Sequence, residues 1–238
     1  MCKLSDLKIK LFADGADKAE MLSLALHPLI SGFTTNPTLM RKAGVTDYRQ
    51  FALDIVKAIP DRPISFEVFA DDSVGMDRQA RVITSWGPNV YVKIPITNSN
   101  GISMCQLIHD LSHRGIKVNI TAMMTLNQVR EVSTAVAGGA SCYVSVFAGR
   151  IADTGRDPVP IMAEAVEILR ATPHAKLLWA SPREVLNIFQ ADSIGCHVIT
   201  ATGDILKKLS LIGRDLDEYS LDTARMFYHD AEQAGYSL

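Results

Sequence analysis

The chain of 238 residues alternates short apolar runs with longer segments of helical periodicity. The apolar runs are rich in β-branched residues, which is typical of buried strands. Because a helix between two strands returns the chain to the same end of the sheet, this alternation predicts a parallel sheet. Eight strands are predicted, at Ile9–Asp14, Gly32–Asn36, Ile64–Ala70, Val90–Thr97, Val118–Met124, Cys142–Ala148, Lys176–Ser181 and His197–Thr202.

The intervening segments carry apolar residues at helical spacing, and several begin with a residue suited to a helix N-terminus. Asp17, Thr46 or Asp47, Thr125 and Ser181-Pro182 stand at such positions. Eight strand–helix units in about 210 residues favour an α/β fold of the (β/α)8 TIM-barrel type. A doubly wound sheet stays open as the alternative, although no GxGxxG follows the first strand. The predicted helices are Ala19–Leu26, Tyr48–Ile59, Met104–His113, Leu126–Ala137, Val159–Leu169, Pro182–Phe189 and Gly203–Leu211.

We expect residues 1–238 to form one barrel domain, since the chain has no linker or low-complexity tract. One further helical segment, Ser220–Ala234, follows the eighth unit and has no strand to accompany it. Its apolar side chains include Leu221, Met226 and Phe227. This C-terminal helix is therefore expected to cover the barrel or a neighbouring subunit.

The composition argues against several classes of protein. A formal charge of −2 gives no reason to expect nucleic acid or an anionic membrane as a partner. Charges among the first ten residues predict that no signal peptide is present, and no apolar stretch is long enough to span a membrane. The scattered cysteines Cys2, Cys105, Cys142 and Cys196 are expected to be reduced, as in a cytoplasmic protein.

Lys93 lies in the middle of the apolar run Val90–Thr97, where a charged side chain is unusual. Removing an ammonium group from water is costly, and a buried lysine without a partner tends to lose its proton. A neutral amine is a nucleophile towards carbonyl groups, so Lys93 is a candidate Schiff-base former. The alternative is a lysine at a strand end whose ammonium group reaches solvent.

Other polar residues also interrupt the predicted strands. In a parallel barrel these positions converge at one end, where active sites of this architecture lie. Each one taken alone could be a hydrogen-bonded core group. Together they supply an amine, two carboxylates and several hydroxyl and amide groups. The residues are Asp14, Thr34, Thr35, Asn36, Glu67, Lys93, Asn119, Thr121, Ser145 and Ser181.

We expect neither a metal nor a cofactor at this site. His109 and His113 have the i, i+4 spacing of metal ligands, but no third ligand lies near them in sequence, so an exposed helix face is favoured.

Several segments resemble the transaldolase family, and the resemblance covers nearly the whole chain. They are Phe12-Ala-Asp14, Gly32-Phe-Thr-Thr-Asn-Pro-Thr-Leu39, Val90-Tyr-Val-Lys93-Ile-Pro, Asn119-Ile-Thr121, Val144-Ser-Val-Phe-Ala-Gly-Arg150-Ile-Ala-Asp153 and Ala180-Ser-Pro-Arg183. The resemblance implies a (β/α)8 barrel, which agrees with the count of strand–helix units.

The resemblance also implies roles for individual residues. Lys93 would attack the carbonyl of a ketose, Asp14 would take the hydroxyl proton during carbon–carbon cleavage, and Glu67 would act through a water in imine formation. Thr121 would position that water. The remaining matches are to substrate-binding positions: Asn36 and Asn119 for hydroxyl groups, Ser145 for the dihydroxyacetone end, Arg150, Ser181 and Arg183 for phosphate, and Thr34 and Phe147 elsewhere on the substrate.

Two positions distinguish branches of this family. The small fructose 6-phosphate aldolases carry Gln where this chain has Glu67 and Tyr where it has Phe147. Both differences favour a transaldolase that passes dihydroxyacetone from a ketose phosphate to an aldose phosphate, whereas the short chain resembles the aldolases. A lyase that releases dihydroxyacetone, a ketose with another anionic terminus such as a sulfonate, and a non-catalytic sugar-phosphate-binding barrel are the alternatives. The resemblance further implies a homo-oligomer, either a dimer or a decamer.

Overall fold

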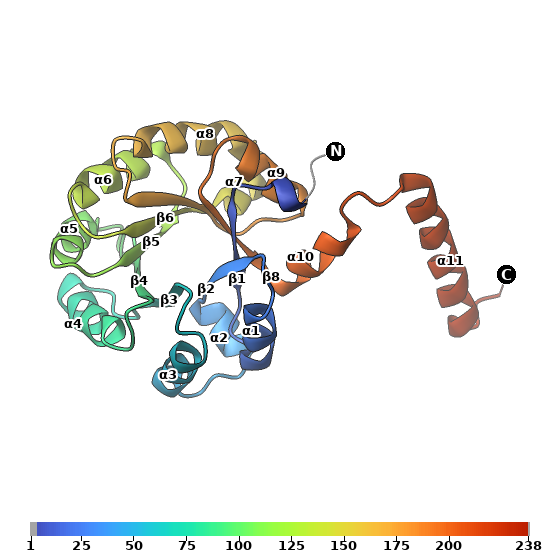
Figure 1. Ribbon diagram of the computed structural model, residues 1–238, viewed down its shortest axis with the longest axis horizontal. Helices are drawn as coiled ribbons and strands as arrows, with labels where there is room; N and C mark the ends of the chain where they lie inside the picture. Colours follow the sequence, from blue (N-terminus) through green and yellow to red (C-terminus); the bar gives the residue numbers. More distant parts are fainter. Residues whose placement is uncertain (1–3, 238) are drawn as a thin grey trace.

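The computed structural model describes residues 4–237 and contains a closed barrel of eight parallel strands in sequence order (Figure 1). This confirms the predicted (β/α)8 barrel. The strands are β1 (Lys10–Asp14), β2 (Ile30–Thr34), β3 (Ile64–Glu67), β4 (Val90–Pro95), β5 (Val118–Met123), β6 (Cys142–Val146), β7 (Ala175–Trp179) and β8 (Val198–Thr202).

Helices surround the strands on the outside of the barrel (Figure 1). They are α1 (Lys18–Ala25), α2 (Pro37–Lys42), α3 (Tyr48–Ala58), α4 (Ser73–Thr84), α5 (Cys105–His113), α6 (Leu126–Val136), α7 (Ala148–Asp153), α8 (Pro158–Leu169), α9 (Leu186–Ser193) and α10 (Gly203–Lys207), with short 3-10 turns at Leu4–Asp6 and Lys208–Leu211. The main core lies between the strands and these helices, and includes Ile55, Ile108 and Met162.

The predicted helix starts follow the expected chemistry in three places. Asp17 and Asp47 cap α1 and α3 by accepting a hydrogen bond from the main-chain N–H three residues on. Thr125 forms a reciprocal capping box with Gln128 at the start of α6. Ser181-Pro182 does not begin a helix, because the chain continues as a loop until α9 begins at Leu186.

The sequence patterns missed three helices. Helices α2 and α7 have only six residues each, too few to show a helical period. Helix α4 is longer, but a buried Gly75 in its first turn interrupts the apolar pattern. Several predicted strands also extend too far at their carboxyl ends, as at β3, which ends at Glu67 rather than Ala70.

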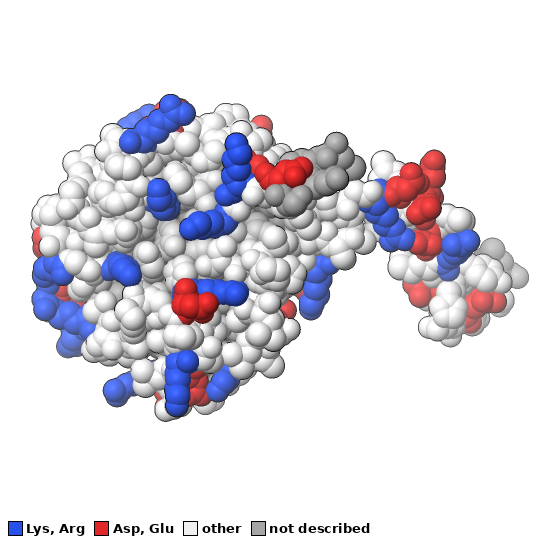
Figure 2. All heavy atoms as spheres, viewed as in Figure 1, with Lys and Arg blue, Asp and Glu red and all other residues white. Residues whose placement is uncertain are grey.

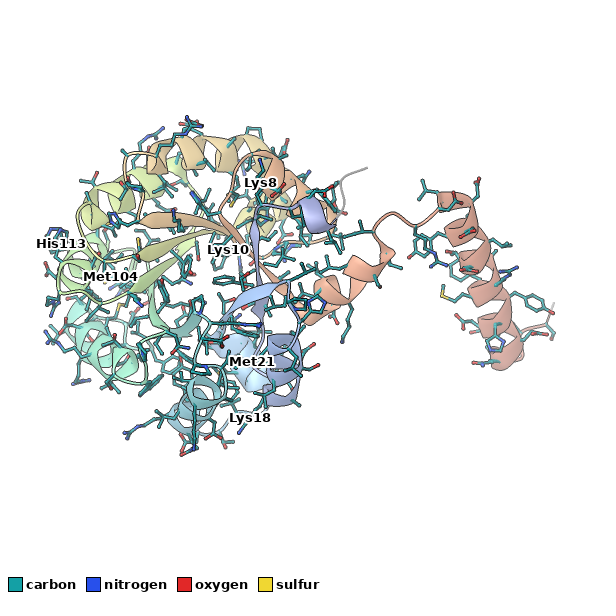
Figure 3. All side chains as sticks on the ribbon, viewed as in Figure 1. Lys8, Lys10, Lys18, Met21, Met104 and His113 are labelled. Atoms are coloured by element: carbon teal, nitrogen blue, oxygen red, sulfur yellow. The ribbon has the colours of Figure 1, made fainter. Side chains whose placement is uncertain are left out.

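The last helix, α11 (Leu216–Ala234), stands away from the barrel, beyond α10 (Figure 1). None of its residues is buried. Figure 3 shows its side chains directed into the surrounding space, and Figure 2 shows both acidic and basic side chains on it. Leu216, Tyr219, Met226 and Phe227 are among its exposed large apolar residues.

Within residues 4–237, no helix is long and apolar enough to cross a membrane. In the same range no three histidine, cysteine or acidic side chains lie close enough to hold a metal ion. Cys105, Cys142 and Cys196 are free thiols, whereas Cys2 lies outside the described residues.

Candidate active site

A cavity of about 390 Å³ lies at the carboxyl ends of the barrel strands. Its wall includes every predicted site residue except Thr35 and Arg183. Asp14, Thr34, Asn36, Glu67, Lys93, Asn119, Thr121, Ser145, Phe147, Arg150 and Ser181 are brought together there. The convergence follows from parallel strands, whose carboxyl ends meet at one mouth of the barrel.

Lys93 projects into this cavity and is 7% exposed. Strand register places it beside Glu67 on β3 and Asn119 on β5. Its Nζ lies 3.2 Å from Glu67 Oε2 and donates a hydrogen bond of 2.8 Å to the Thr35 carbonyl. The buried lysine therefore has two partners, and one of them is a carboxylate that was predicted to lie at the same site. A carboxyl group beside the amine can exchange protons with the oxygen of an attacked carbonyl.

Asp14 ends β1 on another side of the cavity. The Thr34 hydroxyl donates to Asp14 Oδ1 at 2.8 Å and lies 2.6 Å from the Thr200 hydroxyl. Since Thr34 gives its only proton to Asp14, Thr200 must be the donor to Thr34. Burial raises the pKa of Asp14, although Lys93 and the Thr34 hydrogen bond act in the opposite direction. A raised pKa suits a carboxylate that has to accept a proton.

A chain of hydrogen bonds fixes the amide of Asn119. Ser145 donates to Asn119 Oδ1 at 2.6 Å, and Asn119 Nδ2 donates to the Ser65 hydroxyl at 2.9 Å. Thr121 is also buried, and its hydroxyl makes no hydrogen bond to any described protein group. Thr121 therefore presents a hydroxyl that remains available to a water or a substrate oxygen.

The backbone adopts an unusual conformation at two points of the cavity, one within β5 where its register with β6 shifts and one in the loop after β7. Ala122 and Ser181 have φ values of 63° and 58°, in the left-handed region that residues other than glycine seldom adopt. Both residues line the cavity. Such conformations persist where the surrounding structure holds them, and they gather at functional sites.

The predicted anion-binding residues separate into two environments. Arg150, on α7, lines the cavity and has its guanidinium carbon 5.7 Å from the centre of the Phe147 ring. Arg183 does not line the cavity but forms an ion pair with Asp153, its Nε lying 2.8 Å from Oδ1. This carboxylate holds the pKa of Arg183 above its usual range. Arg150 is thus the arginine that faces the cavity.

Several wall residues were not among the predicted site residues. Thr200 on β8 continues the hydrogen-bond chain from Asp14, and Pro37, Thr38 and Leu39 present the first turn of α2. Asn36 caps this helix by accepting from the Leu39 N–H at 3.0 Å. Thr200 sits in the alternating pattern of its strand, so inward-facing polar positions on β8 could have indicated it.

The sequence matches one protein family and relatives named after it. The model of a family described as Transaldolase/Fructose-6-phosphate aldolase matches residues 11–238. A probable transaldolase from Thermoanaerobacter sp. is 34% identical over 231 residues, covering 97% of this chain and all of the relative. A probable transaldolase from Dehalococcoides mccartyi is 34% identical over 84% of this chain and 90% of its own length. One from Rhodospirillum centenum is 33% identical over 95% of this chain and 96% of its own length.

Solved structures share the barrel at lower sequence identity. A 3-hexulose-6-phosphate synthase from Salmonella typhimurium superposes with a TM-score of 0.57 at 15% identity, over 84% of this chain and 91% of its own. A dihydrodipicolinate synthase from Rhodopseudomonas palustris gives a TM-score of 0.55 at 15% identity, over 90% and 79%. These similarities support the fold.

Proposed function

Because the chain belongs to the Transaldolase/Fructose-6-phosphate aldolase family and is an enzyme of the transaldolase type, we propose that it transfers dihydroxyacetone between sugar phosphates. The donor is a ketose phosphate, such as fructose 6-phosphate or sedoheptulose 7-phosphate, and the acceptor is an aldose phosphate. Such transfers belong to the pentose phosphate class of carbohydrate metabolism. The observation that carries the proposal is Lys93 beside Glu67, in one cavity with Asp14.

The first half of the reaction forms an imine. The Lys93 amine adds to the ketone carbon of the donor, and the resulting carbinolamine loses water to give the imine. Glu67, 3.2 Å from Nζ, supplies and recovers protons in these steps through a water that Thr121 positions. Asn119 and Ser145, fixed by their mutual hydrogen bond, bind hydroxyl groups of the dihydroxyacetone part.

The second half breaks and remakes a carbon–carbon bond. Asp14 takes the proton of the hydroxyl on the carbon that becomes the aldehyde, so the electrons of the breaking bond pass to the imine and form an enamine on Lys93. The aldehyde product leaves, the enamine carbon attacks the acceptor aldehyde, and Asp14 returns its proton to the acceptor's oxygen. Hydrolysis of the new imine returns Lys93 to its free form. Arg150 binds the phosphate of donor and acceptor, with Ser181 and, after reorientation from Asp153, Arg183.

Transfer is favoured over release by Phe147, which lines the cavity. A phenyl ring has no proton to give to the enamine carbon, so the intermediate persists until an aldehyde arrives. The test is incubation with fructose 6-phosphate, with and without erythrose 4-phosphate, while both products are measured. Turnover should depend on the acceptor. Rapid release of free dihydroxyacetone, unaffected by acceptor, would support the lyase instead.

We also propose that the protein is a homo-oligomer of the cytoplasm in which α11 packs on a neighbouring subunit. The apolar side chains of α11 are exposed in the single chain, and a second copy would cover them. Three free thiols suit a reducing compartment.

A further inference from the structure

The hydrogen bonding between β2 and β3 stops short at the active-site end of the barrel. These strands pair only at Phe33 with Ile64 and Thr34 with Ser65, and the last main-chain bond runs from the Thr35 N–H to the Ser65 carbonyl at 3.2 Å. A parallel ladder would continue with a bond from the Glu67 N–H to the Thr35 carbonyl. On its other side, Glu67 still pairs with Lys93 of β4.

The missing bond is replaced by two others. The Thr35 carbonyl accepts from Lys93 Nζ at 2.8 Å, so it holds the candidate nucleophile in place of a strand neighbour. The Glu67 N–H donates to the Tyr48 hydroxyl at 2.8 Å, and that hydroxyl donates to the Glu67 carbonyl at 3.0 Å. A single side chain thus satisfies both main-chain groups of Glu67.

Tyr48 is itself firmly placed. It is the first residue of α3, and its ring meets Phe69, Trp86 and Phe66 edge-on with centroids 4.5, 5.8 and 6.1 Å away. Burial raises the pKa of Tyr48 well above its usual value, so the hydroxyl keeps the proton that it donates. Tyr48 does not line the cavity.

We propose that Tyr48 is a positioning residue, which holds Glu67 beside Lys93. The Thr35 carbonyl of the neighbouring chain segment cannot hold the Glu67 main chain, because it accepts the hydrogen bond from Lys93 Nζ. The inference rests on the proposed role of Glu67 in imine formation. In this arrangement Thr35 orients the nucleophile and Tyr48 orients the acid, so both are fixed before substrate binds. Loss of the Tyr48 hydroxyl would free the main chain of Glu67 and misplace its carboxyl group.

The test is Tyr48→Phe, which keeps the ring and removes both hydrogen bonds. Imine formation with fructose 6-phosphate, followed by rapid borohydride quenching, should slow about tenfold, as expected for one or two lost hydrogen bonds. Carbon–carbon cleavage of the imine, once formed, should keep its rate because Asp14 performs it. In a Glu67→Gln background, where the acid is already absent, adding Tyr48→Phe should change the rate less than about twofold.

Tyr143→Phe is the matched control, since it also removes a buried tyrosine hydroxyl but from the barrel interior outside the cavity wall. It should leave the rate of imine formation unchanged. The thermal unfolding midpoint of each variant shows whether the variant is folded, so that a slower reaction in a folded variant can be assigned to the position of Glu67. In the unchanged protein, the Glu67 amide should be protected from hydrogen exchange although its N–H makes no hydrogen bond to a neighbouring strand.

Each contrary result has a distinct meaning. An unchanged rate in folded Tyr48→Phe, an equal loss in the Glu67→Gln background, or rapid exchange of the Glu67 amide would overturn the positioning role alone. No adduct on Lys93 in the unchanged protein would overturn the proposed function and this inference with it.

Discussion

Asp14 gives a single-residue prediction in which activity and stability change in opposite directions. Burial raises its pKa above the usual value of 3.8. Between 3.8 and that raised value, the folded protein binds more protons than the unfolded chain, so the free energy of unfolding falls as pH rises. Asp14→Asn removes the buried negative charge, so the variant should have a larger free energy of unfolding than the unchanged protein at neutral pH. The difference should disappear below pH 3.8, where Asp14 is protonated in both the folded and the unfolded state. Denaturant unfolding measured across pH checks this.

The same variant should accumulate the imine on Lys93 without cleaving the donor, because an amide cannot accept the hydroxyl proton. Asp54→Asn is the control, since Asp54 is on the surface and the hydrogen bond from Lys18 holds its pKa below the usual value. It should retain activity and gain no stability at neutral pH. Normal cleavage by Asp14→Asn would show that another group is the base.

Phe147 makes the clearest prediction about reaction outcome. Phe147→Tyr places a proton donor near the enamine carbon, so release of dihydroxyacetone should rise relative to transfer. A tenfold change in this partition requires only about 1.4 kcal/mol in relative barrier height. The ratio of free dihydroxyacetone to transferred product, measured at fixed acceptor concentration, checks it. Phe147→Leu is the control without a hydroxyl, and an equal rise in both variants would argue against proton donation.

At the scale of elements, the close contact between α7 and the loop after β7 sets the shape of the anion-binding side. Gly149 N–H bonds to the Ala180 carbonyl at 3.3 Å, and a Cβ on Gly149 would lie only 1.5 Å from the Ser181 carbonyl oxygen. Gly149→Ala should therefore separate α7 from the loop, weaken binding of phosphorylated substrates and destabilise the fold by about 1–3 kcal/mol.

The measurements are KM for fructose 6-phosphate and the unfolding midpoint. Gly15→Ala serves as the control, because nothing lies within 4 Å of an added Cβ there. A Gly149→Ala protein with unchanged KM and stability would show that the two segments can separate without consequence.

The order and number of strands followed from sequence, because buried parallel strands are continuous apolar runs and their interrupting polar residues share one end. Lys93, Asp14 and Glu67 were identifiable for that reason. The contacts of Arg183 and Tyr48 were not, since they depend on side-chain directions across elements distant in sequence. Short helices such as α2 and α7 were missed because six residues show no period.

At the scale of the whole molecule, α11 extends from the barrel with no residue buried. Leu216, Tyr219, Met226 and Phe227 share one face by helical spacing, which is the pattern of a helix that packs against a partner. Light scattering should therefore give a dimer or a larger assembly. Truncation before Leu216 should reduce its size, while Phe227→Asp should weaken association without deleting the helix.

The control for the charge substitution is Glu232→Gln, which changes a polar position of the same helix. A stable monomer, unaffected by truncation, would contradict the proposed role of α11. An assembly of unchanged size after truncation would place the interface on the barrel instead.

The most direct test of the central claim is borohydride reduction in the presence of fructose 6-phosphate, followed by mass spectrometry of the digested protein. We expect a covalent adduct on Lys93. In the unchanged protein the mass of the adduct should correspond to a retained dihydroxyacetone unit, and in Asp14→Asn it should correspond to the whole hexose phosphate. Lys93→Arg should give no adduct, because a guanidinium group does not condense with a carbonyl at neutral pH. An adduct on a different lysine, or none with any ketose phosphate, would contradict the account.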